Sequence, residues 1–104
     1  MAATPEAKVK KKIKDMLKAY GAYYAMPVAG MFGSAGVPDF LVCYVGVFIG
    51  IEAKAGRGKT TALQDKNLRD IREAGGQAIV VNEQNIDELE DLLERVLNSS
   101  PNSR

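Results

Sequence analysis

The chain has 104 residues, a hydrophobic fraction of 46%, a charged fraction of 26% and a net charge of +1, which predict one globular domain. The lack of histidine and the single cysteine, Cys43, exclude Ser-His and Cys-His catalysis, His-ligated zinc and an internal disulfide framework. No apolar stretch is long enough to span a bilayer, and the charged N-terminal segment has no signal-peptide core, so we expect a cytoplasmic protein without a membrane partner.

The first predicted element is a helix over residues 4–20, with Thr4 as its cap and Pro5 at its first position. Glu6 lies three residues before Val9 on the apolar stripe, so we expect it to face the sheet; stabilisation of the helix dipole is the alternative. Lysines crowd the other faces, where they are available to phosphates or simply solvated. They are Lys8, Lys10, Lys11, Lys12, Lys14 and Lys18.

Residues 22–28 predict a short strand at a sheet edge, because Pro27 cannot donate a ladder hydrogen bond. A glycine-rich loop follows over residues 29–36. Its glycines do not form G-x-G-x-x-G, which argues against a dinucleotide site. Small residues let a ligand backbone approach closely, and Ser34 is a candidate phosphate contact.

The central predicted element is a β-hairpin over residues 37–54, a run rich in β-branched and aromatic residues with acids only at its two ends. Folding this run at Val45-Gly46 places Asp39 opposite Glu52, and Lys54 projects from the same face about 7 Å further along. Valine is unfavourable at positive φ, so a longer loop is the alternative, and a one-residue slip would send the two acids to opposite faces. Because Cys43 lies inside the apolar run, we expect it to be a buried structural thiol.

Two adjacent carboxylates at the end of an apolar ribbon repel each other, so they either share a proton or bind a cation. Oxygen ligands suit Mg²⁺, which typically takes one or two carboxylates and keeps several waters. A lysine beside such an ion can orient or activate a water, or balance charge on a phosphate. The alternative is that Asp39 follows Pro38 in a turn while Glu52 and Lys54 form an ordinary strand-end ion pair.

The segment after the hairpin carries Arg57 and Lys59, which we expect in a mobile loop that clamps the backbone of the substrate. Residues 58–60 (Gly-Lys-Thr) do not form a Walker A motif, because the glycine required five residues before Gly58 is Ala53. No nucleotide cofactor is therefore expected.

A second helix is predicted over residues 61–74. Gln64 follows Thr61 with capping-box spacing, and its alternative role is to orient the lysine or a phosphate. Residues 77–81 predict another strand, and Asn85 is expected to cap a last helix whose acids we interpret as a solvated surface. The single domain covers residues 1–98, and residues 99–104 have the composition of a disordered tail.

The order of elements predicts an α/β sandwich around a mixed sheet of about four strands, with helices on both faces. Pro38-Asp39 and Glu52-Ala53-Lys54 resemble the PD-(D/E)xK nuclease signature. The wider frame resembles the virus-type replication-repair nuclease (VRR-NUC) domain, since Glu6 lies in the first helix and Gln64 opens the second. The resemblance implies a restriction-endonuclease-like αβββαβα sandwich.

The resemblance also implies a metal-dependent DNA endonuclease. Asp39 and Glu52 would hold one or two Mg²⁺ or Mn²⁺ ions, the backbone carbonyl of Ala53 would be a further ligand, and Glu6 would act through water or a second ion. Lys54 would steer or activate the water, with Gln64 completing the catalytic set. The further residues expected to contact DNA are Ser34, Arg57, Lys59, Lys8, Lys11 and Lys12.

By the same resemblance, the substrate is branched DNA, especially the four-way (Holliday) junction, and the protein is a homodimer with two active sites across a two-fold axis. The alternative substrates are flapped, nicked or linear duplex DNA. From a different class, the chain would be a DNA-binding module without catalysis. The intact set of Asp39, Glu52 and Lys54 favours the enzyme, because a module has no need of an unpaired acid cluster.

Overall fold

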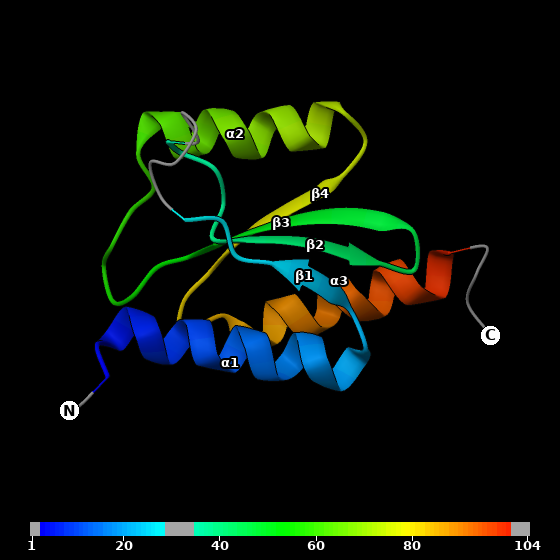
Figure 1. Cartoon of the computed structure of the whole chain (residues 1–104), viewed down its shortest axis with the longest axis horizontal. Helices are drawn as coiled ribbons and strands as arrows, with labels where there is room; N and C mark the ends of the chain where they lie inside the picture. The colour runs from blue at the N-terminus through cyan, green and yellow to red at the C-terminus, as the bar shows by residue number, and fades with distance from the viewer. Residues whose placement is uncertain (1–2, 29–34, 101–104) are drawn as a thin grey trace.

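The computed structural model of the chain describes residues 3–28 and 35–100 (Figure 1). It confirms the predicted order of helices and strands and the α/β class. The elements are α1 (Pro5–Tyr20), β1 (Tyr23–Ala25), β2 (Phe40–Tyr44), β3 (Val47–Ala53), α2 (Ala62–Glu73), β4 (Gln77–Val81) and α3 (Ile86–Ser99). None of the helices in these two ranges is long and apolar enough to cross a membrane.

The four strands form one mixed sheet in the order β1-β2-β3-β4. The first three strands are antiparallel neighbours, and β4 pairs in parallel with β3. A parallel neighbour requires a crossover, and α2 provides it. The predicted edge position of the first strand is confirmed, although β1 is shorter than the expected 22–28.

Helices cover both faces of the sheet, with α1 and α3 on one side and α2 on the other (Figure 1). The core lies between the sheet and the pair α1 and α3, because alternate residues of β2 and β3 point toward these helices. Its largest fully buried side chains are Phe40, Ile13, Leu17, Ile49, Ile51, Leu89 and Leu93. On the other side, α2 buries Leu68 and lies close to the backbone at Gly50.

The central hairpin has the predicted register, which runs from Phe40 opposite Ile51 to the pair that flanks the turn. Continued by one residue beyond β2, this register aligns Asp39 with Glu52. The turn has two residues, Val45 with φ 45° and Gly46 with φ 84°, so the alternative of a longer loop is wrong. Valine is strained in the left-handed region, and the surrounding pairing of β2 and β3 holds it there.

The C-terminal boundary differs from the prediction. Helix α3 runs through Ser99, and Ser100 is 8% exposed and donates a hydrogen bond from Oγ to the Val45 carbonyl at 3.1 Å. Ser99 and Ser100 thus belong to the helix end rather than to a disordered tail. Residues 101–104 of the predicted tail lie outside the described residues.

Asn85 precedes α3 as predicted, but its side chain makes no capping hydrogen bond. Its Oδ1 accepts from the Asn82 amide at 2.6 Å, and its Nδ2 donates to the Val80 carbonyl at 2.9 Å. The predicted N-cap position is therefore confirmed, whereas the side chain bonds within the connection from β4 into α3 instead of capping the helix.

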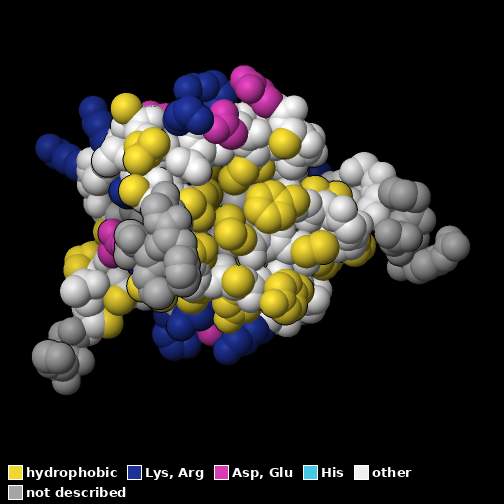
Figure 2. All heavy atoms as spheres, turned by 45° about the horizontal axis from the view of Figure 1, so that its top comes forward, with side chains coloured by type: hydrophobic (Ala, Val, Ile, Leu, Met, Phe, Trp, Pro, Cys, Tyr) yellow, Lys and Arg dark blue, Asp and Glu magenta, His cyan; other side chains and the backbone are white. Residues whose placement is uncertain are grey.

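On the side of α2, one part of the sheet surface is not covered by residues 3–28 or 35–100. Tyr23, Cys43 and Phe48 are aligned across β1, β2 and β3, and all three are exposed. Figure 2 shows hydrophobic side chains gathered on the middle of this face, with Lys and Arg groups toward opposite sides. The prediction of a buried Cys43 is wrong, because α2 packs over β3 and β4 and leaves this side of β2 open.

Candidate active site

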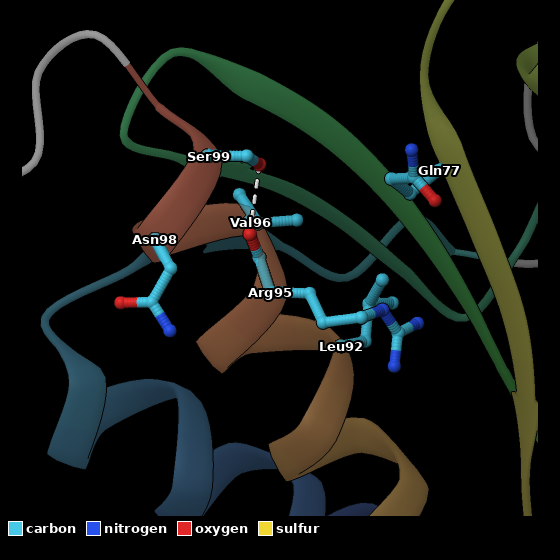
Figure 3. A pocket seen from close by; sticks show the side chains of 6 residues that line it. All are labelled: Gln77, Leu92, Arg95, Val96, Asn98 and Ser99. Carbon is cyan, nitrogen blue, oxygen red and sulfur yellow. Dashed lines mark hydrogen bonds between the residues drawn. The ribbon is translucent and has the colours of Figure 1, made fainter.

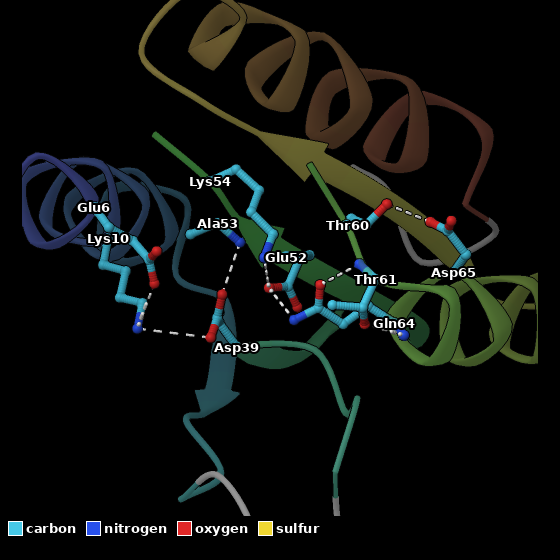
Figure 4. Close-up of polar contacts among 10 residues, drawn as sticks. All are labelled: Glu6, Lys10, Asp39, Glu52, Ala53, Lys54, Thr60, Thr61, Gln64 and Asp65. Carbon is cyan, nitrogen blue, oxygen red and sulfur yellow. Dashed lines mark hydrogen bonds and ion pairs between the residues drawn. The ribbon is translucent and has the colours of Figure 1, made fainter. Parts of the chain in front are cut away.

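The predicted acids meet at one end of the sheet (Figure 4). Asp39 lies immediately before β2, and Glu52 is the penultimate residue of β3. Because β2 and β3 pair in the predicted register, the backbone brings both residues to the same edge. Gln64, in the first turn of α2, approaches this edge from above the sheet.

The Asp39 carboxylate is fixed across the hairpin. Its Oδ2 accepts a hydrogen bond from the Ala53 amide at 2.8 Å, and its Oδ1 lies 3.6 Å from the Lys10 ammonium. The side chain is 23% exposed, so solvent and ligands reach it. The backbone amide of Ala53, the residue after Glu52, thus orients the carboxylate of Asp39.

Glu52 is a buried carboxylate with two donors on the same oxygen. Its Oε2 accepts from Gln64 Nε2 at 3.1 Å and lies 3.6 Å from Lys54 Nζ. Burial and, after it, the negative charge of Asp39 raise the pKa of Glu52 to about 7, although Lys54 opposes the shift. The two carboxylates therefore interact closely, and near neutral pH the pair can hold a proton between them.

Gln64 forms the predicted capping box and also contacts the buried acid; its alternative role of orienting the lysine or a phosphate stays a prediction. The Gln64 Oε1 accepts a hydrogen bond from the Thr61 backbone amide at 3.0 Å. The Gln64 backbone amide donates to Thr61 Oγ1 at 3.1 Å, which completes the predicted capping box. The remaining Nε2 donates to Glu52. The capping box thus orients the side-chain amide of Gln64, which donates to the buried Glu52 carboxylate.

Helix α1 contributes a residue that the sequence analysis did not assign to the site. Lys10 lies between Glu6, at 3.3 Å, and Asp39, at 3.6 Å. Burial opposes its charge, but Asp39 and then Glu6 outweigh this effect and raise the pKa of Lys10. The signal in the sequence was its i,i+4 spacing from Glu6. The Glu6 side chain is 47% exposed and reaches the acid pair only through Lys10.

The predicted DNA-binding residues lie at the surface around this site. Lys8, Lys11 and Lys12 are exposed on α1, and Lys11 pairs with Asp15 at 2.9 Å. Ser34 lies outside the described residues. Their role in DNA binding stays a prediction.

Arg57 and Lys59 are exposed in the segment between β3 and α2. This segment is anchored by Glu83, whose two carboxylate oxygens accept from the Gly56 amide at 2.8 and 3.1 Å. No local pattern in the sequence distinguishes Glu83 from the solvated acids of the helix that follows it. Its contact ties the basic segment to the connection that follows β4.

A surface cavity of about 500 Å³ adjoins the site between the start of α1 and the end of β3. It is lined by Thr4, Pro5, Glu6, Ala7, Lys10 and Ala55. A second cavity of about 480 Å³ lies between α3 and the start of β4 and includes none of the predicted site residues (Figure 3). Of these two cavities, only the first includes a predicted site residue, Glu6, together with Lys10.

The donor set fits a divalent ion of the magnesium type. Asp39 and Glu52 supply two oxygen-bearing groups at one edge, and both already attract ammonium groups, from Lys10 and Lys54. Within residues 3–28 and 35–100, no group of three or more acids, cysteines or histidines lies close enough to hold a metal. Mg²⁺ commonly binds through one or two carboxylates and completes its shell with water and phosphate oxygens.

The sequence was compared with protein-family models and with curated proteins, and neither comparison found a match. Among solved structures, one described as a VRR_NUC domain is similar, with a TM-score of 0.74 and 28% sequence identity. The similarity covers 86% of this chain and 97% of that one. The order of elements, the mixed four-stranded sheet and this structural match support a VRR-NUC domain, a nuclease domain consistent with the PD-(D/E)xK superfamily.

Proposed function

We propose that the chain is a metal-dependent endonuclease that hydrolyses phosphodiester bonds in DNA. The observation that carries this proposal is the convergence of Asp39 and Glu52 at one sheet edge, with Lys54 beside the buried acid. Burying a carboxylate next to another is unfavourable for folding, so a stable protein gains little from it unless a cation binds there.

Asp39 and Glu52 would hold Mg²⁺ or Mn²⁺, with the Ala53 carbonyl as a further ligand and Glu6 acting through water or a second ion. When bound, such an ion activates the attacking water and offsets charge on the leaving oxygen. The Lys54 ammonium orients the water or neutralises the phosphate, and it is 17% exposed beside Glu52. Gln64 keeps the Glu52 carboxylate in place through its Nε2 donor.

The DNA backbone would lie along the exposed lysines of α1 and the segment that carries Arg57 and Lys59. These residues offer charge to phosphates without reading bases. A branched substrate, in particular the four-way junction, is proposed from the resemblance to VRR-NUC nucleases, and so is a homodimer with paired sites.

The sheet face that the described residues leave open is the surface we propose for the second copy. Tyr23 is 75% exposed and Phe48 is 44% exposed, and aromatic side chains of this size dominate the centres of protein interfaces. With the exposed Cys43 aligned between them across the strands, they supply the apolar centre for an interface of about 800 Å² per partner. Two copies joined in this way carry two sites.

The direct test is cleavage of end-labelled linear, flapped and four-way DNA with Mg²⁺, with Mn²⁺ and with EDTA. We expect cutting that requires the ion, favours the four-way junction and falls at least 100-fold in Asp39→Asn, Glu52→Gln and Lys54→Met. The control variant is Lys66→Met, which removes an exposed lysine on α2 paired with Asp70. DNA binding in EDTA without cutting under any divalent ion would instead indicate a binding module.

A further inference from the structure

The Lys10 ammonium lies next to the acid pair and is a counter-ion of Asp39. Its ammonium lies 3.6 Å from Asp39 Oδ1 and 3.3 Å from Glu6 Oε2, and its side chain is 31% exposed (Figure 4). The other lysine of the site, Lys54, takes the opposite acid, Glu52, at 3.6 Å. Each of the two acids thus has one ammonium as its counter-ion.

The two counter-ions differ in how firmly they are held. Lys54 directly follows β3, its backbone amide donates to the Val81 carbonyl of β4 at 2.9 Å, and its side chain is only 17% exposed. Lys10 reaches Asp39 from a separate helix, and its side chain lines the cavity of about 500 Å³ beside the site. Lys10 therefore has open space beside it into which its ammonium can move without a change in the fold.

Asp39 has one oxygen committed to the Ala53 amide, so its Oδ1 is the oxygen that remains for a cation. An ammonium and a divalent ion compete for that oxygen, because both require the same negative charge. We propose that Lys10 is a displaceable counter-ion of Asp39, which leaves the carboxylate when a divalent ion binds and so sets the ion concentration that the site needs. This inference rests on the proposed function of the acid pair as a metal site.

The consequence is a positioning residue whose removal strengthens ion binding. A partly exposed ion pair changes an equilibrium by at most about fivefold, and Lys10 makes two such contacts. We therefore expect Lys10→Met to bind Mn²⁺ about three- to tenfold more tightly than the parent chain. Lys10→Arg, which keeps the charge and the contact, is expected to bind Mn²⁺ no more tightly than the parent.

The test is calorimetric titration of the full chain with MnCl₂ in the absence of DNA. Lys66→Met is the matched control, because Lys66 also forms an i,i+4 pair on an exposed helix surface, with Asp70 at 2.8 Å, but lies on α2. Its Mn²⁺ affinity is expected to equal that of the parent. Asp39→Asn is expected to lose at least tenfold in affinity, and this arm tests the proposed metal site itself.

A second measurement on the unmodified chain does not depend on any variant. The rate of acetylation of each lysine, followed by mass spectrometry, is expected to rise at Lys10 when Mn²⁺ is added and to stay constant at Lys66. The inference would be overturned if Lys10→Met and the parent bound Mn²⁺ equally tightly, or if Mn²⁺ did not change the acetylation rate of Lys10. Either result would leave the acid pair as a metal site. Unchanged affinity in Asp39→Asn would overturn the metal site as well.

Discussion

Replacing Glu52 by glutamine is expected to stabilise the protein at alkaline pH while it abolishes cutting. Burial and the neighbouring Asp39 raise the pKa of Glu52 from 4.5 to about 7. The folded chain therefore holds a proton at this position more tightly than the unfolded chain. Above pH 7 the parent must keep an ionised, buried carboxylate next to another one, and glutamine removes that cost while it can still accept the hydrogen bond from Gln64.

The magnitude follows from the pKa shift. A rise from 4.5 to about 7 corresponds to about 3 kcal/mol if nothing diminishes it. Water reaches the site beside Asp39 and the substitution removes the Lys54 ion pair, so we take about half of this, about 1.5 kcal/mol. For a domain of this size, such a gain raises Tm by roughly 5–10 °C.

The sign of the pH dependence is the informative part. Below pH 4.5 Glu52 is protonated in both the folded and the unfolded chain, so variant and parent are expected to unfold alike. Between pH 4.5 and 7 the parent loses stability relative to the variant, and above pH 7 the difference is constant. Urea unfolding followed by circular dichroism from pH 4 to 9 in EDTA measures it.

Glu73→Gln is the control for the loss of one carboxylate, because Glu73 is exposed at the end of α2. The free energy of unfolding of Glu73→Gln is expected to differ little from that of the parent, and this difference is expected not to grow between pH 4.5 and 7. If Glu52→Gln were no more stable than the parent at pH 8, or if its advantage were the same at pH 4, the described electrostatics of the acid pair would be wrong.

Three further substitutions test other parts of the account. Gly50→Val is expected to destabilise the chain by about 1–3 kcal/mol in urea unfolding, because a Cβ on Gly50 would lie 2.5 Å from Ile71 Cδ1 and 3.2 Å from Pro38 Cγ; a neutral result would refute the close packing of α2. Phe48→Glu is expected to convert a dimer into a monomer in light scattering, whereas an unchanged mass would place the interface elsewhere. Glu83→Gln is expected to increase hydrogen exchange at the Gly56 amide about tenfold, since it weakens a charge-assisted contact, and equal exchange would show that Glu83 does not anchor the segment.

The hairpin was predictable because its signals are local and agree with one another. The acids at its two ends, the turn at Val45-Gly46 and the alternation of apolar residues all indicate one register. The pairing of Asp39 with Glu52 follows from that register alone. The doubt about valine at positive φ was physically sound, but the strand pairing on both sides outweighed the local preference.

The contacts that the sequence did not reveal are all between distant segments. Lys10 was one lysine among six on its helix, and only the approach of α1 to β2 distinguishes it. The sequence around Glu83 indicates a solvated acid, and only the fold places its carboxylate beside the Gly56 amide. Cys43 is exposed because α2 does not extend over its side of β2. The residues of β2 alone do not show how far a helix will cover the sheet.

The central claim is that Asp39 and Glu52 together hold one divalent ion. Anomalous diffraction from a crystal soaked in MnCl₂ at pH 8 tests it most directly, because the signal locates the ion itself. We predict a single strong peak with oxygens of both carboxylates about 2 Å away. A peak bound to only one of the two acids, or no peak at this edge of the sheet at saturating Mn²⁺, would contradict the account.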